Sequence, residues 1–146
     1  PCPLVTPEDY RFELGRAVWL RRGGDITIIS TGEQTSRVME AADMLFQDGI
    51  DVTVLHVPTI KPLDVEAVVE AASTDLVVTA EDHSIIGGLG GAVAEVLGEH
   101  RPTRLKRIGW QDVFGESGAN QDLREKYGLT AGYVAQAARD LLAVHQ

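Results

Sequence analysis

The 146 residues are enough for one domain, because single globular cores usually contain about 100–200 residues. A hydrophobic content of 44% is sufficient for a packed core, and no apolar run approaches the roughly 20 residues that span a bilayer. The formal net charge is −9, and an acidic surface repels phosphodiester backbones and anionic lipids, so we expect no nucleic-acid partner and no membrane partner. The single cysteine, Cys2, excludes an internal disulfide and, with no signal-peptide pattern, predicts a cytoplasmic location.

Apolar segments and helical patterns alternate along the first half of the chain. The nearly continuous apolar run at 25–30 is typical of a strand buried on both faces. A helical repeat follows at 35–47, and Gly49 is expected to end this helix. Its predicted apolar face consists of Val38, Ala42, Leu45 and Phe46. A second buried strand is predicted at 51–57.

The alternation continues through the middle of the chain. Asp64 is expected to cap a short helix at 65–72. A third strand is predicted at 76–80, and a weaker fourth strand at 105–109. Between them lies a third helix, which Gly98 is expected to end. Its apolar stripe consists of Leu89, Val93, Val96 and Leu97.

Thr130 is expected to cap a final helix. Strands spaced by roughly 25 residues, with a helix in each gap, are what right-handed βαβ units require. The sequence therefore predicts an α/β domain over 10–146, with three α/β/α layers and a mostly parallel sheet. Residues 15–21 alternate in polarity and can add an antiparallel edge strand. Residues 1–9 are polar and proline-bearing, as in a linker, so we expect further polypeptide to precede them.

One loop after a predicted strand combines carboxylates, a histidine and glycines. Glu81 and His83 leave the third strand and precede a glycine cluster that opens a helix. Glycines at a helix N-terminus let backbone N–H groups approach an anion, so the loop is a candidate anion or partner contact. The candidate residues are Glu81, His83, Gly87, Gly88, Gly90 and Gly91.

The alternative interpretation of this loop is structural, and the residues favour it. The cluster fits neither G-x-G-x-x-G, because Val93 stands where the last glycine belongs, nor a P-loop, because no lysine follows. Small residues are also needed where a helix packs closely on a strand. An acid beside a histidine can tune a general base, but an anchored loop is the favoured reading of Glu81 and His83.

No residue is assigned a catalytic, cofactor-binding or metal-binding role. His56 ends an apolar strand and is expected to be a satisfied core residue. The loop at 114–118 (FGESG) is expected to connect to the final helix or to contact a neighbouring domain. On its residues alone, the chain is predicted to be an α/β domain without a self-sufficient active site.

Several motifs nevertheless occur together and in order. They are 15–17 (GRA), 30–32 (STG), 60–64 (IKPLD), 81–90 (EDHSIIGGLG), 107–109 (RIG), 114–118 (FGESG) and 127–129 (YGL). Over Tyr10 to Leu142 the chain resembles the carboxy-terminal domain of the transketolase superfamily. It is most similar to the split transketolases, with kinship to deoxyxylulose-phosphate synthases and to the β subunit of pyruvate dehydrogenase decarboxylases.

This resemblance implies a thiamine-diphosphate enzyme of carbohydrate metabolism that transfers a two-carbon ketol unit between sugar phosphates. In the family, thiamine diphosphate and Mg²⁺ lie between two other domains, and the Gly-Asp-Gly motif that holds the diphosphate is absent from this sequence. We therefore expect the chain to bind no cofactor and to be inactive alone. Its expected role is structural and dimer-contacting, within a homo-oligomer or hetero-oligomer that includes the thiamine-binding domains or subunits.

Two other functional hypotheses remain. The chain can be a ligand-sensing or partner-docking module of a related thiamine-diphosphate enzyme, because of its glycine-rich helix start. A small free-standing hydrolase is the other possibility, but the sequence has no G-x-S-x-G and no H-E-x-x-H motif.

Overall fold

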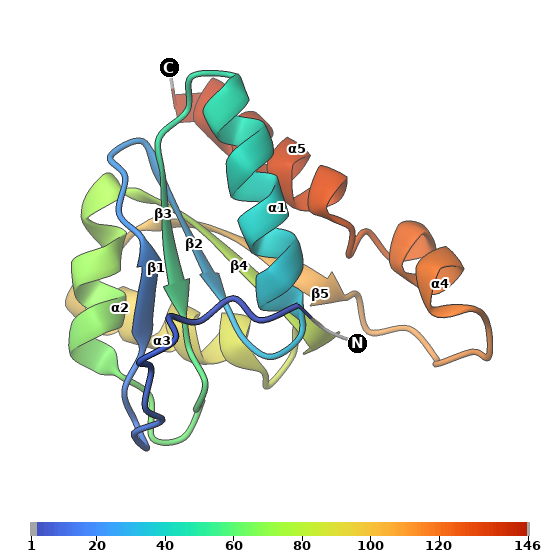
Figure 1. Ribbon diagram of the computed structural model, residues 1–146, viewed down its shortest axis with the longest axis horizontal. Helices are drawn as coiled ribbons and strands as arrows, with labels where there is room; N and C mark the ends of the chain where they lie inside the picture. The colour runs from blue at the N-terminus through green and yellow to red at the C-terminus, as the bar shows by residue number, and fades with distance from the viewer. Residues whose placement is uncertain (1–2, 146) are drawn as a thin grey trace.

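The computed structural model describes residues 3–145, and residues 1–2 of the predicted linker lie outside the described range. Its centre is a sheet of five strands in the order β1-β3-β2-β4-β5 (Figure 1). The strands are β1 (Val18–Arg21), β2 (Ile26–Ser30), β3 (Val52–His56), β4 (Leu76–Ser84) and β5 (Arg104–Trp110). The helices are α1 (Gln34–Gln47), α2 (Val65–Ala71), α3 (Leu89–His100), α4 (Asn120–Lys126) and α5 (Ala131–His145), with a 3₁₀ turn at Ala72–Thr74.

The sheet is mostly parallel, and helices cover both of its faces. The β2–β3, β2–β4 and β4–β5 pairs are parallel, whereas β1 pairs antiparallel with β3 at the edge. In Figure 1, α1 and α5 lie on one face of the sheet, while α2 and α3 lie on the other. The predicted three-layer architecture and the antiparallel edge strand are therefore confirmed.

Two apolar clusters, one on each face, hold the layers together. Alternate residues of a strand point to opposite faces, so each central strand contributes to both clusters. On the α1 and α5 side the strands contribute Ile26, Ile28, Val52, Val54, Leu76, Val78, Ala80 and Ile108. On the α2 and α3 side they contribute Ile29, Leu55 and Val77. Burial on both faces explains why the strands read as continuous apolar runs.

Two local predictions were wrong, and one helix was missed. Gly98 lies inside α3 and does not end it, because the helix continues to His100 and the space around the Gly98 Cα is open. Phe46 is 67% exposed, since it lies about 100° around α1 from the buried Leu45. The helix α4 was not predicted, because it has no buried residue and therefore no apolar stripe in its sequence.

Other helix ends agree with the predictions. Gly49 follows α1 with a φ of 79° and donates its N–H to the Phe46 carbonyl. Thr130 precedes α5, and its Oγ1 accepts from the Tyr133 N–H at 3.4 Å. No helix within residues 3–145 is both long enough and apolar enough to cross a membrane.

Asp64 joins α2 to the segment before β1. Its Oδ1 accepts from the Ala67 N–H at 3.1 Å, as an N-cap does, and its Oδ2 accepts from the Ala17 N–H at 2.9 Å. We expect Asp64→Ala to lower the free energy of unfolding by about 2 kcal/mol, because a cap and a second hydrogen bond to a charged acceptor are both lost. Urea denaturation measures this. The exposed Asp9→Ala is the control and is expected to change stability by less than about 0.5 kcal/mol. Equal effects of the two substitutions would contradict the expectation.

Candidate functional site

The carboxyl edge of the parallel strands is where an open α/β sheet places its ligands. The strand β2 lies between β3 and β4, so the chain leaves β2 toward one side and later returns on its other side. The loops that follow β2 and β4 therefore meet at the topological switch point. The strand β4 runs to Ser84, beyond the predicted end at residue 80, so Glu81 is the last buried residue of β4 and His83 lies in its exposed end. The glycines that follow lead into α3 at this edge.

Glu81 is a fully buried carboxylate that binds the N-terminus of α3. Its Oε1 accepts from the Leu89 N–H at 2.8 Å, and its Oε2 accepts from the Gly90 N–H at 2.6 Å. These N–H groups are among those that a helix leaves unpaired at its start, and the helix dipole favours a negative charge there. The anion that the glycine-rich sequence indicates is thus supplied by the chain itself, and an external anion would have to displace Glu81 from these two N–H groups.

The four glycines of the candidate site differ in what they do. Gly88 and Gly90 are buried, and a Cβ on Gly88 would lie 1.8 Å from Glu81 Oε1, while a Cβ on Gly90 would lie 2.8 Å from Thr79 Oγ1. Gly87 has a φ of +74°, a conformation that L side chains rarely adopt. Gly91 meets nothing within 4 Å and needs neither the space nor the backbone freedom of glycine.

His83 is exposed and is not part of a catalytic pair in this geometry. Its Nδ1 lies 2.9 Å from the Ser84 carbonyl oxygen and 3.8 Å from Glu81 Oε1. The neighbouring Asp82 accepts from the indole N–H of Trp110 at 3.3 Å. Within residues 3–145, no cluster of three or more His, Cys, Asp and Glu side chains could hold a metal ion.

His56 is held in a short chain of hydrogen bonds at the same edge. Its Nδ1 lies 2.8 Å from Thr35 Oγ1, which in turn accepts from the Ser30 hydroxyl at 3.0 Å. Burial lowers the pKa of His56 below its usual value, and a hydrogen bond with the Ser30 backbone opposes this shift. A half-buried, hydrogen-bonded imidazole is the satisfied residue that the sequence indicates.

The loop at 111–119 and α4 form an arm that projects from the domain (Figure 1). Glu116 accepts from Lys126 Nζ and from the Tyr127 hydroxyl, and these two hydrogen bonds lower the pKa of Glu116. Arg124 of α4 also donates to Glu33 Oε1 at 2.8 Å, across the carboxyl edge. Phe114, in the middle of the loop, is 99% exposed. Sequence reasoning missed the pair of Arg124 and Glu33 because 91 positions separate the two residues in the chain.

Two polar hollows lie beside the arm, with volumes of about 270 and 130 Å³, and both are lined by Glu33 and Arg124. Arg37 also donates to Glu33 Oε1, at 3.2 Å, so one carboxylate oxygen serves two guanidinium groups. These groups join α1 to α4, and the arrangement offers ion pairing rather than a nucleophile with its base.

Comparison with known families shows that the sheet, the loop around Glu81 and the arm lie within one known domain family. A family model described as transketolase, C-terminal domain, matches residues 15–134, which include the sheet, the Glu81 loop and the arm. The chain belongs to the transketolase C-terminal domain family. The Glu81 hydrogen bonds and the FGESG loop are thus features of one member of this family, and the resemblance seen in its motifs is confirmed.

Individual relatives of this transketolase C-terminal domain support the same family assignment. It is 47% identical over 142 residues to a 6-deoxy-6-sulfo-D-fructose transketolase subunit from Clostridium sp. (strain MSTE9), a match that covers 97% of this chain and 44% of the relative. It is 42% identical over 132 residues to a 1-deoxy-D-xylulose-5-phosphate synthase from Heliobacterium modesticaldum, covering 88% of this chain and 20% of the synthase.

A solved structure agrees over nearly the full chain. A protein described as a split gene transketolase, inactive beta4 tetramer, superposes with a TM-score of 0.93 at 48% identity, covering 99% of this chain and 48% of that one. The chain therefore spans less than half the length of each of these three relatives.

Proposed function

We propose that this chain acts as the C-terminal, non-catalytic part of a thiamine-diphosphate transketolase-type enzyme in the cytoplasm. The complete enzyme transfers a two-carbon ketol unit between sugar phosphates, and polypeptide outside these 146 residues holds thiamine diphosphate and Mg²⁺. The observation that carries the proposal is the match of 99% of this chain to 48% of a protein described as a split gene transketolase.

The geometry of the carboxyl edge supports a structural role. The Glu81 carboxylate accepts from two helix N–H groups that could otherwise bind a diphosphate, and the guanidinium groups of Arg37 and Arg124 both bind Glu33. Polar groups at the edge are used to fix loops and helices of the domain itself. A magnesium diphosphate needs clustered oxygen ligands, which these ion pairs do not offer.

Calorimetry with thiamine diphosphate and MgCl₂ tests this proposal. We expect no saturable heat from the 146-residue chain, and no turnover of sugar phosphates by it. Co-expression with a thiamine-binding domain or subunit of the same enzyme is expected to yield a complex with ketol transfer. Saturable micromolar binding of the cofactor by the chain alone, or turnover without a partner, would overturn the proposal.

The expected partners are the thiamine-binding domains or subunits and further copies in a homo-oligomer or hetero-oligomer. Two of the relatives carry the word subunit or tetramer in their names, which supports such an assembly. Mass measurement of the native protein checks it. A monomer that copurifies with no thiamine-binding polypeptide would contradict it.

A second candidate is a partner-docking role for the loop at 81–91. Glu81, Gly88 and Gly90 are buried in it, but His83 and Gly87 are exposed, and Ile86 beside them is 61% exposed. Contact with another protein chain would remove this apolar side chain from water, which is favourable. This candidate requires that amide signals of Ile86 and Gly87 shift when the partner subunit is added.

A further inference from the structure

The strand β5 is an edge strand with an open outer side. It ends the strand order on the side of the sheet opposite β1 (Figure 1). Alternate residues of a strand direct their N–H and C=O groups to opposite sides, so half of these groups in β5 face away from β4. In the part of the chain that the structure describes, residues 104–108 make no backbone hydrogen bond outside the pairing with β4.

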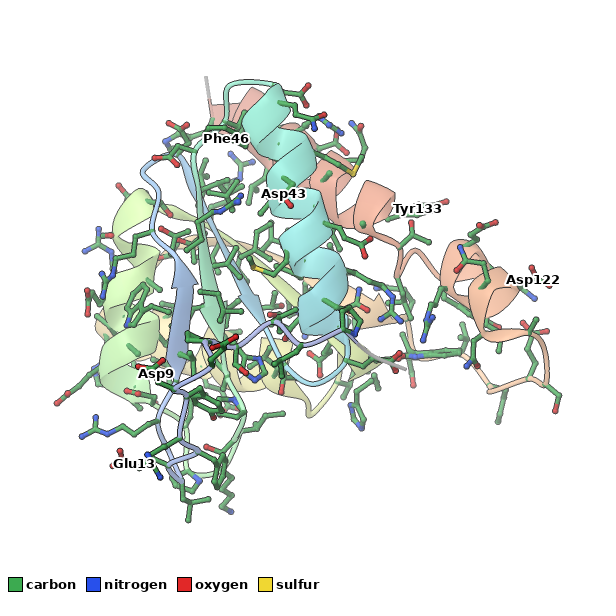
Figure 2. All side chains as sticks on the ribbon, viewed as in Figure 1. Asp9, Glu13, Asp43, Phe46, Asp122 and Tyr133 are labelled. Atoms are coloured by element: carbon green, nitrogen blue, oxygen red, sulfur yellow. The ribbon has the colours of Figure 1, made fainter. Side chains whose placement is uncertain are left out.

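A groove runs between this open edge and α5. Two neighbouring cavities of about 440 and 190 Å³ share Lys106, Tyr133 and Ala137 as lining residues. The wall from α5 is largely apolar, and Tyr133, which Figure 2 labels, is 54% exposed there. Leu141 and Val144 extend the apolar wall, and Val144 is 64% exposed. The groove therefore joins unpaired strand groups to exposed apolar surface.

The opposite wall is basic. Arg104 and Lys106 line the larger cavity and Lys106 also lines the smaller one, whereas the Arg107 guanidinium donates to the Ile85 carbonyl at 2.8 Å, near the start of α3. Asp140 is the acid among the described residues that line the two cavities. The Arg104 guanidinium donates to the Val144 carbonyl at 3.3 Å, and Asp140 Oδ1 accepts from Gln136 at 2.8 Å. The groove is thus positive in a chain whose formal net charge is −9.

We propose that an extended, acidic segment of a partner polypeptide binds in this groove as an added strand on β5. Its backbone pairs with the open edge of β5, its carboxylates contact Arg104 and Lys106, and its apolar side chains pack on Tyr133 and Leu141. The positive groove attracts an acidic segment. A second copy of this chain is a less favourable occupant, because two chains that each carry a formal net charge of −9 repel one another. Lysine on an edge strand also discourages aggregation, and the experiment below distinguishes this simpler role.

The probe is a heptapeptide with blocked termini. It has threonine at its even positions, and glutamate and leucine alternate at its odd positions. We expect saturable changes in the amide NMR signals of β5 and of the facing side of α5, complete below about 1 mM peptide, and slower amide exchange in β5. Replacing the glutamates by lysine, or the threonines by proline, is expected to abolish binding. Lys106→Glu is expected to weaken binding at least tenfold, whereas the charge-matched Lys61→Glu, at an exposed site away from the groove, leaves it unchanged.

Four results would overturn the proposal. They are no signal change up to the stated concentration, equal binding of the lysine peptide, equal binding by the Lys106→Glu variant with an unchanged melting temperature, and β5 signals that depend on the chain's own concentration. The last result, with a dimer in sedimentation, assigns the groove to a second copy. If the native chain binds no peptide and Lys106→Val self-associates, the lysine only protects the edge.

Discussion

Replacing Glu81 by alanine is expected to lower the free energy of unfolding by about 3–5 kcal/mol, the largest single effect predicted for this domain. The carboxylate makes two buried hydrogen bonds, to the N–H groups of Leu89 and Gly90. Alanine removes both and leaves two buried donors without a partner at the positive end of α3. Chemical denaturation monitored by circular dichroism measures the loss.

The same variant opens a cavity at the start of α3 that a small carboxylate can enter. We expect sodium acetate to raise the melting temperature of Glu81→Ala by about 2–4 °C relative to sodium chloride of equal ionic strength, and to leave the native chain unchanged. Glu81→Gln keeps the size of the side chain but not its charge, so its stability should fall between the two. A loss for Glu81→Ala below about 1 kcal/mol would show that the helix N-terminus does not depend on this carboxylate.

Gly88→Ala is expected to lower the free energy of unfolding by about 3 kcal/mol, through the same interaction. A Cβ at this position would lie 1.8 Å from Glu81 Oε1 and 2.9 Å from the backbone oxygen of Ser84. The φ of Gly88 is −100°, which alanine adopts freely, so the cost comes from displacing the buried carboxylate and from crowding the Ser84 oxygen, and not from an unfavourable φ. Urea denaturation of the variant measures it.

Two controls separate this steric effect from a general effect of the substitution. Gly91→Ala lies in the first turn of the same helix, and its Cβ would meet nothing within 4 Å, so we expect a gain of about 0.5–1 kcal/mol. In the Glu81→Ala background, Gly88→Ala should cost less than in the native chain, because the carboxylate is gone and only the Ser84 oxygen remains within 3.0 Å of the new Cβ. Strictly additive effects would mean that Gly88 and Glu81 are not coupled.

Much of the fold could be predicted from the sequence, because the signals for these strands and helices lie within short stretches of the chain. The apolar runs at 25–30 and 51–57 form β2 and β3 because strands buried on both faces must be apolar throughout. Asp64 caps α2 because its side chain reaches an N–H three residues away. The arm was not predicted, since α4 buries no residue and its ion pair with Glu33 joins residues that are distant in the chain.

The candidate site shows the same division. The sequence alone placed Glu81, His83 and the glycine cluster at a strand end beside a helix start, and its motifs indicated the family. Only the tertiary structure decided that Glu81 turns inward to bind α3 while His83 turns outward to solvent, and that β5 keeps an open, basic edge beside α5. The physical reason is that residue types and spacing determine which elements form, whereas the direction of a loop side chain and the order of strands depend on contacts between segments far apart in the sequence.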